Sequence, residues 1–285
     1  MTRTTFAIGG DLEVRRLGFG AMHLPTEPEE ARAAAVAVAR RAVELGVTLI
    51  DTAHMYGGGG ANEELLAEAL HPYPDGLLIT TKVGIARSAG SGEWELDGRP
   101  EVLRDQVEQA LRRLRVERIE LLQLHRIDPR TPLADQLGTL AELRAEGKVG
   151  RIGLSEVTVD ELAEARKLID VASVQNRYNL LDREHEPVLD ACTAAGIAFL
   201  PWRTVAWGDA GARAEVAAVA AELDATPTQV ALAWLLAHSP AVLPIPGTAH
   251  VGHLEENVAA AGLELTPAQR ARLDGLGDTA NGAQA

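Results

Sequence analysis

The chain has 285 residues, of which 46% are hydrophobic, and a formal net charge of −14 at pH 7. Such an acidic surface argues against nucleic acids and anionic membranes as partners, and the single cysteine, Cys192, excludes an internal disulfide framework. We find neither the apolar segment of a signal peptide nor a run long enough to span a bilayer, and we therefore expect a cytoplasmic protein.

Short apolar segments alternate with amphipathic helices along nearly the whole chain. An N-terminal hairpin is predicted first, over residues 5–8 and 12–16, with its turn at Gly9, Gly10 and Asp11. Eight strands follow, each apolar at consecutive positions, as is typical of parallel strands buried on both faces. They cover residues 17–20, 47–52, 77–82, 119–125, 149–155, 172–178, 197–202 and 242–246. This order predicts a (β/α)8 TIM barrel with the hairpin capping its bottom.

Helix boundaries and loops fit a single domain over residues 1–285, with a final helix ending at Leu276 and a flexible tail over residues 277–285. Asn62 is predicted to cap a helix, residues 84–99 to form a long functional loop, and residues 211–238 to hold two helices. Helix ends are predicted at Gly46, Gly147 and Gly196. Capping boxes are predicted for the pairs Thr26 and Glu29, Thr158 and Glu161, Thr226 and Gln229, and Thr266 and Gln269.

Three predicted strands end in polar residues suited to proton transfer. Asp51 ends the second strand and Tyr56 follows shortly after it, Lys82 ends the third strand, and His125 ends the fourth. Each residue alone could have a purely structural role, such as capping a turn or packing in the core. All four are nevertheless expected at the same end of a parallel barrel, which favours a catalytic role for the group. Carbonyl reduction by hydride needs a proton donor at the carbonyl oxygen. A tyrosine is protonated at neutral pH, and a charged lysine held by an aspartate stabilises its phenolate.

Seven segments, in this order, resemble the aldo-keto reductase family: LGFGAM, GVTLIDTAHMYG, ITTKVG, LLQLHRID, GKVGRIGLSEV, SVQNRYNLLDR and IPGTAHVGHLEEN. The likeness covers nearly the whole chain. Two of the segments, LLQLHRID and SVQNRYNLLDR, are similar to those of bacterial reductases associated with pyridoxal-like or small aldehyde substrates, and a sugar ketone is an equally open substrate. It implies an NAD(P)H-dependent reductase of an aldehyde or ketone, acting reversibly. It also implies that Tyr56 is the general acid, that Lys82 and Asp51 tune it, and that His125 orients the substrate.

The resemblance further implies a nicotinamide cofactor lying extended across the carboxyl ends of the strands. The sequence has no Gly-rich dinucleotide fingerprint of the Rossmann type, and we expect no metal. NADPH is favoured over NADH. The discrimination between them is expected to be weak, because Gly247, Thr248 and His253 stand where relatives often carry cations for the 2′-phosphate. The implied cofactor contacts are Gly20, Ser155, Gln175, Trp202, Arg203, Gly247, Thr248, His253, Glu256 and Asn257.

The substrate is expected to be a small-molecule carbonyl compound. The pocket is expected to be open and to accept a bulky or polar compound, because the long C-terminal loop that closes the pocket in some relatives is not expected here. Glu156, where the family usually has Asn, places a carboxylate near the nicotinamide. Predicted substrate contacts are Met22, Trp94, Arg126, Glu156 and Trp207, with Met55 as a further lining residue.

Two other functions remain open from the sequence. One is a nicotinamide-binding regulatory subunit, and the other is a non-redox lyase or isomerase on the same barrel, since fold does not fix chemistry. A monomer or weak homo-oligomer is expected.

Overall fold

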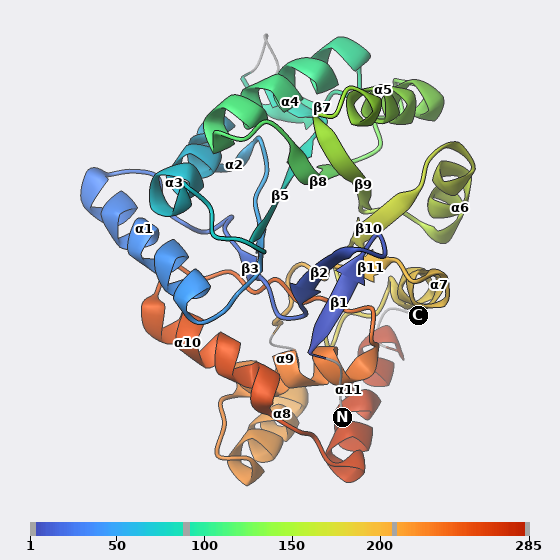
Figure 1. Cartoon of the computed structure of the whole chain (residues 1–285). Helices are drawn as coiled ribbons and strands as arrows, with labels where there is room; N and C mark the ends of the chain where they lie inside the picture. Colours follow the sequence, from blue (N-terminus) through green and yellow to red (C-terminus); the bar gives the residue numbers. More distant parts are fainter. Residues whose placement is uncertain (1–3, 88–91, 207–209, 283–285) are drawn as a thin grey trace.

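A parallel sheet curls around the centre of the molecule in the computed structural model, which describes residues 4–87, 92–206 and 210–282. Within these residues the sheet has seven strands, each paired with its neighbour in chain order (Figure 1). They are β3 (Phe19–Gly20), β4 (Leu49–Asp51), β5 (Leu78–Val83), β8 (Ile119–Leu124), β9 (Val149–Ser155), β10 (Val171–Gln175) and β11 (Ala198–Phe199).

Residues 242–247 close the sheet into a barrel between β11 and β3. Leu243 N–H donates to Phe199 O at 2.8 Å, and on the other side Gly20 N–H donates to Pro246 O at 3.1 Å. The predicted eighth strand therefore occupies its expected place but forms only isolated bridges. The reason is local, because Pro244 and Pro246 have no N–H to donate to a ladder. The predicted TIM barrel is confirmed.

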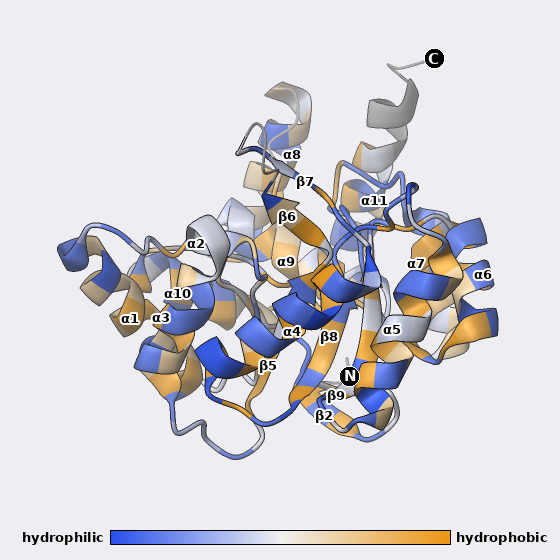
Figure 2. Ribbon diagram, turned by 90° about the horizontal axis from the view of Figure 1, so that it is seen from above, coloured by the Kyte–Doolittle hydropathy of each residue, from blue (hydrophilic) through white to orange (hydrophobic). Residues whose placement is uncertain are grey.

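Helices surround the barrel and turn their apolar sides towards the strands, with hydrophilic stripes outside (Figure 2). In α4, for example, Leu103, Val107 and Leu114 are buried at helical spacing. The helices are α1 (Glu29–Glu44), α2 (Tyr56–Gly59), α3 (Ala61–Leu70), α4 (Pro100–Leu114), α5 (Leu133–Ala145), α6 (Val159–Leu168), α7 (Glu186–Ala195), α8 (Ala210–Glu222), α9 (Pro227–His238), α10 (Val251–Ala259) and α11 (Pro267–Gly282), with a 3-10 turn at Ala260–Gly262.

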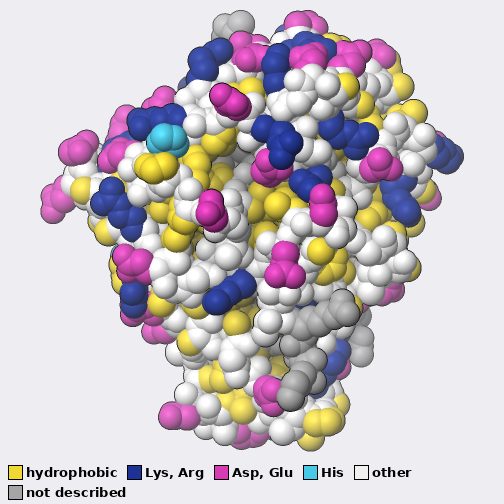
Figure 3. Space-filling model, viewed as in Figure 1, with side chains coloured by type: hydrophobic (Ala, Val, Ile, Leu, Met, Phe, Trp, Pro, Cys, Tyr) yellow, Lys and Arg dark blue, Asp and Glu magenta, His cyan; other side chains and the backbone are white. Residues whose placement is uncertain are grey.

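The predicted N-terminal hairpin is formed by β1 (Thr5–Ile8) and β2 (Leu12–Arg15). Its Ile8 and Val14 are buried in one apolar cluster with Leu49, Leu78 and Leu121 at the early positions of barrel strands. The hairpin thus plugs the amino-terminal end of the barrel, opposite β6 and β7 (Figure 2). On this face positive and negative side chains are interspersed, without a large area of one sign (Figure 3).

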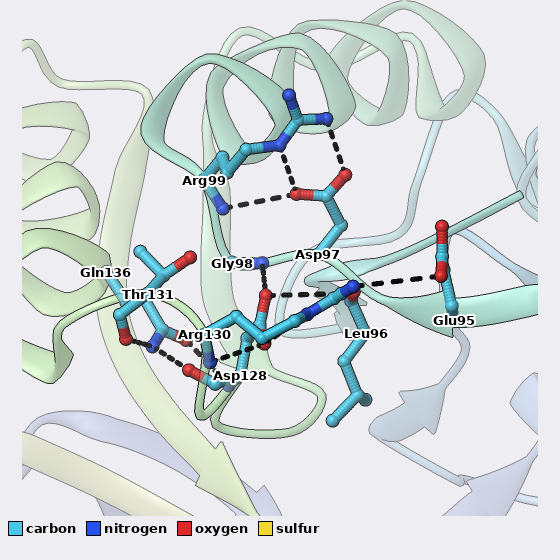
Figure 4. Close-up of polar contacts among 9 residues, drawn as sticks. All are labelled: Glu95, Leu96, Asp97, Gly98, Arg99, Asp128, Arg130, Thr131 and Gln136. Carbon is cyan, nitrogen blue, oxygen red and sulfur yellow. Dashed lines mark hydrogen bonds and ion pairs between the residues drawn. The ribbon is translucent and has the colours of Figure 1, made fainter. Parts of the chain in front are cut away.

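Residues 84–99, expected to be a loop, contain a second hairpin made of β6 (Ile85–Arg87) and β7 (Trp94–Leu96). Buried Asp128 ties the exit of this hairpin to the segment after β8 (Figure 4). Its carboxylate accepts the backbone N–H of Gly98 and that of Arg130, both at 3.0 Å, while Gln136 bonds the Asp128 backbone. The hairpin is therefore anchored beside His125.

Three of the four predicted capping boxes form, at Thr158, Thr226 and Thr266. The fourth prediction is wrong, because α1 begins after Pro28 and Thr26 makes no capping bond. The predicted helix ends at Gly46, Gly147 and Gly196 all have positive φ, which glycine adopts without strain.

Three further boundary predictions are decided by the structure. Asn62 does not cap α3, whose N-cap is Gly60, since its buried side chain bonds Thr52 and the Ala21 carbonyl instead. The two helices expected in 211–238 are present as α8 and α9. Helix α11 continues to Gly282, past the predicted end at Leu276.

Candidate active site

Asp51, Lys82 and Tyr56 meet at the carboxyl end of the barrel. Asp51 is the last residue of β4, Lys82 lies near the end of neighbouring β5, and Tyr56 begins α2. Lys82 Nζ lies 2.6 Å from Asp51 Oδ2 and 2.9 Å from the Thr52 carbonyl oxygen. The same nitrogen lies 3.4 Å from the Tyr56 hydroxyl. One ammonium group therefore joins the carboxylate to the phenol.

Lys82 is 1% exposed, so its charge depends on its partners. Burial disfavours the ammonium form, but attraction to Asp51 and Tyr56 outweighs it and raises the pKa of Lys82 above its usual value. The lysine is therefore charged at neutral pH. A fixed positive charge beside the Tyr56 oxygen stabilises the phenolate that forms when the proton leaves.

The second carboxylate oxygen of Asp51 is held by two amides. Gln175 Nε2 donates to Oδ1 at 2.9 Å and Gln123 Nε2 donates to it at 3.2 Å. Gln123 was not identified from the sequence, although a polar residue between two leucines of a buried strand was a usable signal. These bonds fix the carboxylate so that its other oxygen faces Lys82.

His125 follows β8 and stands edge-on to Tyr56, with ring centroids 6.0 Å apart. Burial first, and then the positive charges of Lys82 and Arg126, lower the pKa of His125 to about 2. The imidazole is therefore neutral at any physiological pH. It presents one N–H donor and does not compete with Tyr56 as an acid.

A cavity of about 890 Å³ opens above these residues, at the upper end of the usual size for a ligand site. Asp51, Tyr56 and His125 line its floor, with Lys82 buried behind them. The cavity also brings together every predicted cofactor residue: Gly20, Ser155, Gln175, Trp202, Arg203, Gly247, Thr248, His253, Glu256 and Asn257.

The cavity wall has features suited to an extended, phosphate-bearing cofactor. A Cβ on Gly20 would lie 2.6 Å from the Ile245 carbonyl oxygen, so only a glycine lets the two backbones approach this closely at the cavity wall. Beyond Gly247 and Thr248, the first N–H groups of α10 point out of the helix end, where they suit an anion. Among the described residues no cluster of three or more potential metal ligands is present.

Glu156 and Trp202 are bonded to one another. The Glu156 carboxylate accepts the Trp202 indole N–H and, at 2.7 Å, the backbone N–H of Arg177. Trp202 lines the cavity, while Glu156 does not. The carboxylate predicted to contact substrate instead holds the aromatic ring from behind.

The other predicted substrate residues are distributed between two cavities. Met22, 57% exposed, and Arg126 line the main cavity, as does Met55. Trp94 lies on β7 with the Arg87 guanidinium 5.0 Å from its ring centre, and lines a neighbouring cavity. Trp207 lies outside the residues that the structure describes.

Several lining residues were not identified from the sequence because their roles depend on chain segments brought together by the fold. Ile85 reaches the cavity from the β6–β7 hairpin, and Thr228 reaches it from the first turn of α9. Further such residues are His23, Thr204, Val205, Ile245 and Pro246.

Comparisons with known proteins agree with this geometry. The profile of the Aldo/keto reductase family matches residues 16–278. An uncharacterised oxidoreductase of Schizosaccharomyces pombe is 46% identical over 93% of this chain and 87% of its own length. The Escherichia coli protein named pyridoxine 4-dehydrogenase is 40% identical over 97% of this chain and 99% of its own length.

A solved structure gives the same result for the fold. The aldo-keto reductase of Klebsiella pneumoniae in complex with NADPH superimposes with a TM-score of 0.85 and 26% identity, covering 97% of this chain and 95% of the other. In the part of our chain that the structure describes, no helix has the length and apolar character needed to cross a bilayer. The chain belongs to the aldo/keto reductase family and is an NAD(P)H-dependent oxidoreductase of carbonyl compounds.

Proposed function

We propose that this enzyme uses NADPH to reduce the aldehyde group of a small polar aldehyde to the alcohol, and that pyridoxal is the first substrate to test. Similarity over nearly the full length to a protein named pyridoxine 4-dehydrogenase supports this choice. Nothing in the comparisons supports a regulatory subunit or a lyase.

The contact of Lys82 Nζ with both Asp51 and Tyr56 carries the proposal. A bound nicotinamide supplies the hydride. As negative charge grows on the carbonyl oxygen, Tyr56 Oη gives up its proton to that oxygen, and the Lys82 ammonium stabilises the phenolate left behind. Neutral His125 donates a hydrogen bond to the same oxygen and orients it.

For the nicotinamide we assign the carboxamide to Ser155 and Gln175 and one ring face to Trp202. The Gln175 amide nitrogen is engaged by Asp51, which leaves its oxygen to accept from a carboxamide. Both side chains are buried at the cavity floor.

For the adenosine end we assign Gly247, Thr248 and α10 to phosphate, and Glu256 and Asn257 to the adenine. Arg203 is an exposed cation lining the same cavity and is the group we assign to the 2′-phosphate. Arg203 supplies less positive charge than the two cations that relatives often carry at the 2′-phosphate, which supports only a modest preference for NADPH over NADH.

The test is a titration of the purified protein with NADPH and with NADH by calorimetry, followed by oxidation of the bound cofactor on adding pyridoxal. Micromolar NADPH binding with aldehyde-dependent oxidation is expected. Tight cofactor binding without turnover of pyridoxal or simple aldehydes would overturn the assignment of substrate class. Failure of both cofactors to bind would overturn the assigned contacts.

A further inference from the structure

Arg126 places a positive charge beside the catalytic tyrosine. It directly follows His125, lines the main cavity, and acts electrostatically on both Tyr56 and His125. Burial lowers the pKa of Arg126, although the guanidinium stays charged in any working range of pH.

The described residues give this guanidinium no ionic partner. Its NH1 donates to the His125 carbonyl oxygen at 2.9 Å and to Ser155 Oγ at 3.1 Å, and no ion pair between described residues involves it. The carboxylate that acts on it electrostatically is that of Glu156, which is already engaged by Trp202 and Arg177. The NH2 and Nε groups have no described hydrogen-bond partner, and neither is enclosed as a buried unsatisfied atom. These donors are therefore accessible, on a side chain that lines the main cavity.

A partly buried guanidinium costs desolvation free energy, which an anion with matching geometry offsets. Arg126 lines the same cavity as Tyr56 and His125, the two residues that define where the reacting carbonyl must lie. An acidic oxygen a few bonds from the carbonyl carbon would meet Arg126 while the carbonyl meets Tyr56.

We propose that Arg126 is a specificity-determining residue that binds an oxyanion on the substrate, so that this enzyme prefers aldehydes carrying an ionised oxygen acid. The inference rests on the carbonyl reduction proposed above and narrows it to anionic substrates. Both a carboxylate and an aromatic hydroxyl that ionises beside the aldehyde, as on pyridoxal, supply this chemistry.

The test compares matched pairs of aldehydes with NADPH as the reductant. The carboxylate pair is 4-formylbenzoate against 4-formylbenzamide, and the phenolate pair is 3-hydroxypyridine-4-carbaldehyde, the reactive core of pyridoxal, against pyridine-4-carbaldehyde. The quantity measured is the ratio of kcat/KM for the anionic member to kcat/KM for the neutral member, which cancels general losses of activity.

Arg126→Met removes the charge and keeps an unbranched, mostly apolar stem, and Arg126→Lys keeps the charge without the planar set of guanidinium donors. We expect Arg126→Met to lower the ratio about 10- to 100-fold in at least one pair, as for a lost charge-assisted hydrogen bond, with Arg126→Lys intermediate. The pair that responds identifies the acid. Arg112→Met, a change of exposed charge on α4, is the matched control and should leave both ratios as in the wild type.

An unchanged ratio in both pairs with a general loss of activity would overturn the proposal, and would leave Arg126 as a residue that merely positions Ser155. If the wild type reduces no aldehyde, the proposed function fails instead. Binding of benzoate and benzamide to the NADPH-saturated protein, measured by calorimetry, then decides the point. Equal discrimination by the wild type and Arg126→Met would overturn it, and loss of benzoate preference in the variant would support it.

Discussion

The carboxylate of Glu156 holds the indole N–H of Trp202, and this bond joins the end of β9 to the cavity wall. Glu156 adopts φ 55°, a left-handed conformation uncommon for a residue with a side chain. The same oxygen accepts the backbone N–H of Arg177, so the acceptor is itself fixed from a second strand end. The orientation of the Trp202 ring is thereby set before any ligand arrives.

From this relationship we predict that Glu156 and Trp202 are energetically coupled in cofactor binding. Glu156→Ala and Trp202→Phe should each weaken NADPH binding. The double variant should lose less binding free energy than the sum of the two single losses, with a coupling free energy of about 0.5–3 kcal/mol. Calorimetric titration of the four proteins measures it. Glu156→Gln, which keeps an acceptor oxygen, is the matched control, and strictly additive losses would contradict the coupling.

Replacing Tyr56 with Phe removes the proton donor but keeps the ring against His125. We expect kcat to fall about 10²- to 10⁴-fold, the usual contribution of a positioned acid, while the NADPH dissociation constant stays near that of the wild type. Single-turnover kinetics with saturating cofactor provide the measurement. Turnover within a few-fold of the wild type would remove Tyr56 from the chemical step.

Because of His54, we expect the unfolding free energy of the protein to fall at acid pH. Burial first, and then Arg113, whose NH1 lies 3.1 Å from His54 Nδ1, lower the pKa of His54 to about 4. Between pH 6.5 and 4 the unfolded chain binds a proton there that the folded chain does not, so stability present above pH 6.5 is lost as the pH falls through this window. Urea unfolding at pH 7, 6, 5 and 4 measures this loss.

His54→Gln should reduce the pH slope of the unfolding free energy by up to about 1.4 kcal/mol per pH unit in the middle of the window. Part of the slope will remain, because His125 has the same sign of shift. His71→Gln, at an exposed site, serves as the control. Parallel slopes for the His54 variant and the wild type would show that His54 does not titrate in this way.

Asp128 should affect both stability and substrate affinity, because it anchors the β6–β7 hairpin that carries Ile85 into the cavity (Figure 4). Asp128→Ala leaves the Gly98 N–H without its acceptor and should lower the unfolding free energy by about 1–3 kcal/mol. KM should rise more than kcat falls. Asp128→Asn keeps one acceptor oxygen and should lower the unfolding free energy less than Asp128→Ala does. Equal effects of the two changes on the unfolding free energy would count against this anchoring.

The regular parts of the fold were predictable because local pattern and tertiary structure agree there. Runs such as residues 119–124 and 149–155 are short and rich in buried Ile, Leu and Val, and they became β8 and β9 with the expected bounds or nearly so. The acidic, basic and aromatic residues at strand ends met as expected because parallel strands bring their carboxyl ends to one face.

Departures arose where long-range contacts compete with local signals. Thr26 and Asn62 have the composition of helix caps, but α1 begins after Pro28 and the Asn62 amide is needed by the buried Ala21 carbonyl. The second hairpin was missed because its two strands have only three residues each and pair without a run of apolar alternation that would signal them. Gln123 and Thr228 belong to the site only through strands and helices distant in sequence.

The backbone pairing between β3 and residues 242–247 restricts which residues can occupy positions 20 and 247. A Cβ on Gly20 would meet the Ile245 carbonyl oxygen at 2.6 Å, and one on Gly247 would meet the Gly20 carbonyl oxygen at 2.8 Å. Both contacts are with backbone, which cannot swing aside as a side chain can. The two positions are thus expected to be intolerant of even alanine in a saturation-mutagenesis screen, where surface glycines such as Gly252, with nothing near a Cβ, should accept most substitutions. The backbone atoms of Gly20 and Gly247 both close the barrel and line the cavity. A substitution at either position is therefore expected to affect folding and activity together.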